Sequence, residues 1–383
     1  MSVTFARGFK ASGVKAGIKS SGNHDVALVV NAGPQVACAA VFTSNKIKAA
    51  PVLWSQEVMK SKNVRAVILN SGGANACTGP EGFADTHKTA EHVANLLNLA
   101  PINVLVCSTG LIGERLPMEK ILAGSDAATK SLSQEGGKDA ALAIMTTDSV
   151  PKLSELEFNG FRIGGMAKGA GMLAPGLATM LVCITTDANI DSIAAQDALQ
   201  RAVEVSFNRI DSDGCMSTND TVVLLANGAS GFNPTFDEFE SALTQVCKDL
   251  ARQLIADAEG SSKDIQIEVI NADSETDAVE VARAVSRSNL LKCAIHGEDP
   301  NWGRVLAAAG TTSAIFEADQ IDVALNGIWV CKNGMTGEDR KLVNMKDRVV
   351  TIKVNLNAGE HSAELWTNDL TAMYVHENSA YSS

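Results

Sequence analysis

The chain has 383 residues, of which 45% are hydrophobic, and a formal net charge of −12 at pH 7. The length predicts two or three domain-sized units or one large α/β body, and the negative charge argues against nucleic acid or an acidic membrane surface as a partner. The N-terminal segment lacks the apolar core of a signal peptide, and no run of about 18 apolar residues could span a bilayer, so we expect a soluble cytoplasmic protein.

Short runs rich in Val and Ile alternate with alanine-rich helical patterns, which is typical of a mixed α/β protein. In chain order, the strands that we expect are Val26–Asn31, Val36–Thr43, Val64–Asn70, Val104–Cys107, Thr179–Thr185, Thr221–Ala226, Ile265–Ile270 and Val349–Leu356. Apolar residues at helical spacing predict helices at Ala84–Leu99, Ile190–Val205, Phe236–Ala258 and Glu275–Ser288. No linker marks a domain boundary, although a break near Pro175–Thr179 is compatible with the pattern.

The eight cysteines and six histidines are scattered along the chain. The cysteines form no C-x-x-C pair and mostly stand among apolar residues, which favours reduced, buried thiols over a zinc site or disulfides. His87 and His92 are five positions apart on an expected helix, so they would not share one face. We expect no metal.

Two strands end in polar, glycine-containing loops, where functional sites are usually built. One loop runs from Asn70 to Cys77, and the other is Ser108-Thr109-Gly110. The second loop offers a hydroxyl and an accessible backbone N–H side by side, which could stabilise an oxyanion. The alternative is a turn that merely ends a strand.

A glycine-rich loop broken by proline, within Gly164–Asp187, leads into the apolar strand that begins at Thr179. Cutting the Ala178–Thr179 bond would give Thr179 a free α-amine, which can serve as the base for its own hydroxyl. The same residues also occur in ordinary turns. Lys168 is followed by glycine rather than Ser or Thr, so the loop is not a P-loop. We expect the residues from Gly164 onward to be loop, so the segment neither follows a strand nor opens a helix, as a dinucleotide site requires.

Three further segments are rich in polar groups. The run Asp211–Thr221 lacks the final Glu of a calcium loop and predicts side chains that bind the backbone of a tight connection. Glu259 stands at the end of a long helix, against the helix dipole, and is either a solvated helix end or a functional group. The terminal run Asn378–Ser383 is either frayed or able to fold back over a pocket.

Taken in order, these segments resemble the ornithine acetyltransferases, also called bifunctional glutamate N-acetyltransferases of the arginine pathway. The resemblance covers almost the whole chain. Its motifs are Asn75–Gly79, Cys107–Gly113, Ile144–Asp148, Lys168–Met172, Ala178–Leu181, Ser217–Thr221, Asp257–Gly260, Asp299–Arg304 and Glu377–Tyr381.

The resemblance implies an α/β fold of mixed sheets with flanking helices, layered α-β-β-α, in a chain that cuts itself into fragments 1–178 and 179–383. It assigns Thr179 as the nucleophile and Thr109 with Gly110 as the oxyanion hole. The residues that it assigns to the substrate pocket are Thr146, Thr147, Lys168, Thr179, Glu259, Asn378 and Ser383. Ser383 stands where many relatives have Thr, which preserves the hydroxyl.

The implied reaction moves an acetyl group from N-acetylornithine to glutamate through an acetyl-Thr179 intermediate, without a cofactor. The resemblance leaves open whether acetyl-CoA is also a donor, and it suggests an α2β2 assembly of the two fragments. Two other classes share some of these features. One is an N-terminal-nucleophile aminopeptidase or amidohydrolase, which would pass the acyl group to water, and the other is a binding protein that stays uncut.

Overall fold

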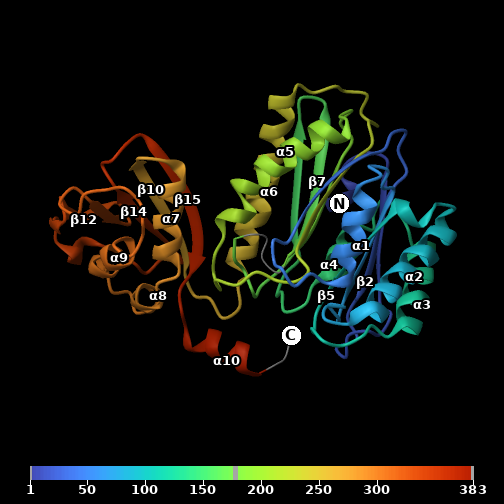
Figure 1. The fold of residues 1–383 in the computed structure, drawn as a ribbon, viewed down its shortest axis with the longest axis horizontal. Coiled ribbons are helices and arrows are strands. Elements are labelled where there is room, and N and C mark those ends of the chain that lie inside the picture. The colour runs from blue at the N-terminus through green and yellow to red at the C-terminus, as the bar shows by residue number, and fades with distance from the viewer. Residues whose placement is uncertain (1, 176–179, 381–383) are drawn as a thin grey trace.

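The computed structural model describes residues 2–175 and 180–380. Figure 1 shows a large body, blue to yellow-green, and a smaller unit, orange to red, beside it. The body holds all the strands up to β9 and the helices up to α6, and the C-terminal unit begins with β10.

The first sheet of the body has four strands in the order β1-β2-β4-β5. Strands β4 and β5 run parallel, and the other neighbours are antiparallel. Helices α2 and α3 pack on its outer face, where Ile68, Val93 and Val106 belong to one apolar cluster. The elements are β1 (Phe9–Val14), β2 (Val26–Asn31), β4 (Ala66–Ser71), β5 (Val104–Thr109), α1 (Ala50–Met59), α2 (Gly79–Leu97), α3 (Met118–Lys130) and the 3-10 helices η1 (Ser2–Thr4) and η2 (Pro101–Asn103).

The second sheet has five strands in the order β3-β9-β8-β7-β6, and only β8 and β9 are parallel neighbours. Helices α5 and α6 cover its outer face. The elements are β3 (Ala37–Phe42), β6 (Lys152–Phe158), β7 (Phe161–Lys168), β8 (Leu181–Thr186), β9 (Thr221–Ala226), α4 (Gly137–Ile144), α5 (Ser192–Glu204), η3 (Phe207–Arg209) and α6 (Phe236–Ala256).

The two sheets pack face to face, and helix α4 contacts strands of both. Leu69 and Leu105 of the first sheet share one buried cluster with Cys183 and Val223 of the second. Because helices cover both outer faces, the body has the layer order α-β-β-α that the resemblance implied (Figure 1).

Helix α6 shows how the sequence specifies one of these layers. Phe239, Val246 and Leu254 recur at helical spacing, and all three are buried against the sheet. The side chain of Thr235 accepts the N–H of Glu238, whose carboxylate accepts the Thr235 N–H, so a capping box fixes the start of the helix. The other end of α6 delivers Glu259 to the candidate site.

The C-terminal unit is a six-stranded sheet, in the order β13-β12-β11-β14-β10-β15, covered by α7, α8 and α9. From this unit, α10 runs back toward the body (Figure 1). The elements are β10 (Asp264–Ala272), α7 (Glu275–Ser286), α8 (Asn289–His296), α9 (Trp302–Ala309), β11 (Asp322–Leu325), β12 (Ile328–Lys332), β13 (Met335–Thr336), η4 (Arg340–Leu342), β14 (Val349–Asn355), β15 (His361–Asn368) and α10 (Ala372–Ala380).

The expected mixed α/β class is confirmed, and the expected strands all have a counterpart within a few residues. One expectation is wrong: Gly164–Lys168 is not loop but the second half of strand β7, so the glycine-rich loop does follow a strand. It leads into strand β8 rather than a helix, so a dinucleotide site remains excluded. Five of the eight thiols are buried, whereas Cys77, Cys215 and Cys293 are exposed.

The predicted fragments 1–178 and 179–383 do not coincide with the two spatial parts. Strands β8 and β9 follow the predicted cut but lie between β3 and β7 in the body. The division into fragments therefore stays a prediction about covalent processing and does not describe a boundary between folding units.

Candidate active site

A cavity of about 70 Å³ collects every predicted site residue that the structure describes. These residues come from segments far apart in the chain and are Thr109, Gly110, Thr146, Thr147, Lys168, Glu259 and Asn378. The cavity is also lined by Ala74, Ile112, Gly171, Met172, Ser217 and Asn219. Their convergence makes this cavity the candidate active site.

The end of β5 supplies Thr109 and Gly110. Gly110 has φ +132°, and a Cβ at this position would lie 2.5 Å from the backbone nitrogen of Gly73. Only glycine allows this close approach of the two loops. The amide of Asn219 donates to the backbone oxygen of Ser108 at 2.8 Å and so fixes the strand end from the other sheet.

Lys168 ends strand β7, and its side chain is fully buried at the cavity wall. Its Nζ donates to the hydroxyl of Thr146 at 3.2 Å. Burial lowers the pKa of the Lys168 ammonium below its ordinary value, whereas the charges of Asp148, Asp220 and Glu259 act in the opposite direction. The cavity wall therefore carries a buried amine whose charged form is favoured by three acidic neighbours.

Glu259 lies just beyond α6 and is buried. Its backbone N–H donates to the oxygen of Ala170 at 2.9 Å, which ties the helix end to the glycine-rich loop. A Cβ on Gly171 would lie 2.7 Å from the Glu259 carboxylate, so the absence of a side chain at Gly171 makes room for this acid. Glu259 is therefore held within the body and is not a solvated helix end.

Asn378 reaches the cavity from α10. Tyr374 of this helix donates its phenolic OH to Asp213 at 2.8 Å, and Asp213 also accepts the N–H of Leu173 at 2.7 Å. Gly260 has φ +62° and packs directly against the backbone of Tyr374. These contacts hold α10 beside the loop that precedes the predicted cut.

Ala178, Thr179 and Ser383, to which the sequence analysis assigned the cut and part of the pocket, lie outside the described residues. The first described residue after the predicted cut is Met180, whose N–H donates to the carboxyl of Asp220 at 3.1 Å. Burial raises the pKa of Asp220 well above its ordinary value.

Several residues of this cavity could not be selected from the sequence. Asn219 and Ser217 were predicted only to bind backbone within their own connection, and the turn bonds Ser217 N–H to Asp220 and Asn219 N–H to Ser217 are present. Asn219 in addition bridges to Ala74 and Ser108, both more than 100 positions away. The only local signal for this role was that Asn219, an amide residue, stands within the polar run Asp211–Thr221.

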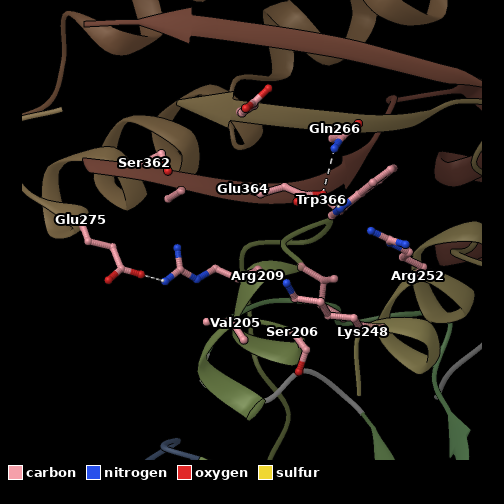
Figure 2. A pocket seen from close by; sticks show the side chains of 14 residues that line it. Val205, Ser206, Arg209, Lys248, Arg252, Gln266, Glu275, Ser362, Glu364 and Trp366 are labelled. Atoms are coloured by element: carbon pink, nitrogen blue, oxygen red, sulfur yellow. Dashed lines mark hydrogen bonds and ion pairs between the residues drawn. The ribbon is translucent and has the colours of Figure 1, made fainter. Parts of the chain in front are cut away.

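A larger cavity of about 350 Å³ lies between the body and the C-terminal unit (Figure 2). There, Arg209 donates to Glu275 at 2.7 Å, and the Arg252 guanidinium lies 5.8 Å from the ring centroid of Trp366. None of the predicted site residues in the described ranges lines this cavity. Its polar groups instead join the two parts of the molecule.

Among residues 2–175 and 180–380, no group of three or more His, Cys, Asp or Glu is placed to hold a metal ion. In the same ranges, no helix combines the length and the apolar character needed to cross a membrane.

Comparison with known proteins places the chain in a family. The family model described as ArgJ matches residues 10–383. The arginine biosynthesis bifunctional protein ArgJ of Streptomyces coelicolor is 63% identical over 383 residues, which is 100% of both chains. The protein of the same name from Thermobifida fusca is 60% identical over the same length and coverage.

Among solved structures, the ornithine acetyltransferase of Mycobacterium tuberculosis in complex with ornithine is 57% identical. The match covers 47% of this chain and 96% of that chain, with a TM-score of 0.45. The family model and the full-length relatives, together with the cavity, lead to one conclusion: the chain belongs to the ArgJ family, the bifunctional acetyltransferases of arginine biosynthesis.

Proposed function

We propose that the chain cuts itself between Ala178 and Thr179 and then transfers the acetyl group of N2-acetyl-L-ornithine to L-glutamate through an ester on Thr179. The products are L-ornithine and N-acetylglutamate. The observation that carries the proposal is the single cavity that contains Thr109, Lys168 and Glu259, each from a different part of the chain.

In the cutting step, the Thr179 hydroxyl attacks the carbonyl carbon of Ala178, and the peptide bond becomes an ester. Water then hydrolyses the ester, which leaves a carboxylate on Ala178 and a free α-amine on Thr179. The unperturbed pKa of such an amine is about 7.7–8.0, which suits a general base at neutral pH.

In the first half-reaction, the Thr179 oxygen attacks the acetyl carbon of N-acetylornithine while the α-amine takes the hydroxyl proton. Thr109 and Gly110 would stabilise the oxyanion, a role in which one lost donor typically costs about 2.7–4 kcal/mol of barrier. The bond between the acetyl carbon and the α-nitrogen breaks, the α-nitrogen receives the proton, and ornithine leaves. Glutamate then enters, and its amine takes the acetyl group from Thr179.

Lys168 would bind the α-carboxylate that both substrates share, and Glu259 would bind the side-chain ammonium of ornithine. The buried positions of both residues support these roles, because a charge pair is stronger where water is excluded. Thr146, Thr147, Asn378 and Ser383 complete the proposed pocket.

The name of the relatives, bifunctional ArgJ, supports acetyl-CoA as a second donor. We also propose that two copies of each fragment assemble as α2β2 and that the enzyme works in the cytoplasm. Activity with acetyl-CoA in place of N-acetylornithine, with glutamate present, tests the second donor, and light scattering of the purified enzyme tests the assembly.

Replacing the nucleophile tests the central step. Thr179→Ala should stay one chain on a denaturing gel and form no acetyl-enzyme, whereas Thr179→Ser should keep some cutting and activity because serine retains the hydroxyl. Mass spectrometry of the wild-type fragment that begins at Thr179 should show one added acetyl group after incubation with N-acetylornithine. Two fragments of normal size from Thr179→Ala would refute the proposal.

Product analysis separates the proposed reaction from hydrolysis. Release of ornithine should depend on glutamate and should be matched by N-acetylglutamate. Equal release of ornithine and acetate, regardless of glutamate, would instead identify an N-terminal-nucleophile hydrolase.

A further inference from the structure

Three linked charged side chains lie behind the candidate active site. They are Asp148, Lys152 and Asp257, and together they form the charge chain. Lys152, at the start of β6, donates to Asp148 and to Asp257, both at 2.5 Å. The side chains of Lys152 and Asp148 are fully buried, and that of Asp257 is 11% exposed. Buried charges are costly to desolvate and persist where their partners hold them in a defined geometry.

Each member of the charge chain binds a segment that carries, or lies next to, a residue of the proposed substrate pocket. Asp148 accepts the N–H of Thr146 at 2.9 Å and the N–H of Gly169, next to Lys168, at 2.7 Å. Both carboxylate oxygens of Asp148 are therefore used to join two sides of the cavity.

Asp257 extends the charge chain to a third side of the cavity, the side that carries Glu259. It lies two residues before Glu259 and accepts the N–H of Ser149 at 2.9 Å, as well as the Ser149 hydroxyl. The loop that carries Thr146 and Thr147 is thus held at one end by Asp148 and at the other by Asp257.

The charge chain also crosses the predicted cut. Asp148 and Lys152 precede the Ala178–Thr179 bond, and Asp257 follows it. After cutting, the contact between Lys152 and Asp257 would therefore join the two fragments at the back of the cavity.

We propose that Asp148, Lys152 and Asp257 are positioning residues for acetyl transfer, which hold Thr146, Thr147, Lys168 and Glu259 in one arrangement across the two fragments. This inference rests on the proposed function of the cavity. None of the three lines the cavity, so they act through the residues that do.

Asp148 has a second effect, on the charge of Lys168. Lys168 faces three carboxyl groups, from Asp148, Asp220 and Glu259, and one like charge, Lys152. On Asp148 itself, burial acts to raise the pKa, but Lys152, Lys168 and the Gly169 N–H outweigh it and hold the pKa below its ordinary value. Asp148 is therefore ionised at neutral pH, and it opposes the loss of the Lys168 proton.

The first test changes Asp257. Asp257→Asn should raise the KM for N-acetylornithine about tenfold or more, because misplaced binding groups lose substrate alignment, and should lower the urea concentration at which the two fragments separate. Asp249→Asn removes an acidic charge from the exposed face of α6, the helix that Asp257 follows, and should behave as wild type; Asp249 contacts Gln253 there.

The second test changes Asp148 and uses pH. When Asp148→Asn removes a carboxylate that favours the Lys168 cation, Lys168 should lose its proton at a lower pH. The KM for N-acetylornithine should then begin to rise at a lower pH than in wild type. A purely structural defect would raise KM by the same factor at every pH. Asp139→Asn, an exposed change on α4, is the control.

A third variant covers the case in which a single substitution prevents folding. Lys152→Met with Asp257→Leu removes both sides of this contact together, so Asp257 is not left as an unpaired charge, and Asp148 keeps the N–H groups of Thr146 and Gly169 as partners. The increase in KM should persist in this double variant. A wild-type KM and pH profile in folded variants would overturn the positioning role. If the wild-type enzyme transfers no acetyl group at all, it is the proposed function that fails.

Discussion

At the scale of single residues, the cavity depends on side chains that are absent as much as on those present. Gly171 leaves the space that the Glu259 carboxylate occupies, and Gly110 lets the end of β5 approach Gly73. Neither requirement can be inferred from local sequence, because each glycine faces a partner distant in the chain. Thr109 was a candidate oxyanion donor from its place in a strand-end loop, with an ordinary turn as the alternative, whereas Lys168 could be selected only through its place in a family motif. The contact between Lys152 and Asp257 could not be inferred from the sequence, since the two residues are 105 positions apart.

Gly171→Ala should displace the Glu259 carboxylate without unfolding the protein, because a Cβ would meet the flexible end of that side chain at 2.7 Å. We expect the kcat/KM for N-acetylornithine to fall about tenfold to a hundredfold, the range for a misplaced binding group, with normal cutting. Gly303→Ala is the matched control, since the nearest atom to its added Cβ is 3.6 Å away. Steady-state kinetics check both variants, and unchanged kinetics in Gly171→Ala would contradict the role given to Glu259.

At the scale of elements, a long segment with a regular apolar repeat could be predicted from the sequence. Short helices and a strand that contains glycines could not. Helix α6 was predicted because its apolar residues repeat over many turns and face one core. The eight-residue helices α4, α8 and α9 are too short for such a signal. The second half of β7 was taken for loop because of Gly164 and Gly165. A Cβ on Gly164 would lie 2.1 Å from the backbone oxygen of Ser2, so this glycine allows another segment to approach the strand.

The attachment of helix α10 to the body should depend on the phenol of Tyr374. Tyr374→Phe removes the hydrogen bond from this helix to Asp213, and an intramolecular hydrogen bond typically contributes about 0.5–1.5 kcal/mol. Because α10 carries Asn378 to the cavity, the KM for N-acetylornithine should rise several-fold with little change in kcat. Val375→Ala, which shortens an exposed side chain of the same helix, should leave KM unchanged. Equal KM values in the two variants would show that α10 is held in place without the phenol.

At the scale of the whole molecule, the predicted cut falls between two strands that are neighbours in one sheet. Strands β7 and β8 pair along their length, from Ile163 opposite Thr186 to Lys168 opposite Leu181. Residues from both sides of the cut also share the two large clusters of the body. The layer order of the fold could be anticipated through the family resemblance, but this interleaving of the fragments could not.

The two fragments should therefore behave as one particle. Wild-type enzyme should elute as a single species in gel filtration yet show two bands on a denaturing gel, because sheet pairing and a shared core replace the lost peptide bond. Separation should need denaturant concentrations that also abolish the circular dichroism of the body. Fragments that part in native buffer would contradict this expectation.

The spread of the cavity residues along the chain has a consequence for biosynthesis. The lining begins at Ala74 and ends at Asn378, and a chain grows from its N-terminus at about 5–20 residues per second. A ribosome-bound chain that ends before α6 lacks Glu259, and one that ends before α10 lacks Asn378. The complete cavity can form only when synthesis is nearly finished, so an unfinished chain holds no assembled acetyl-transfer site.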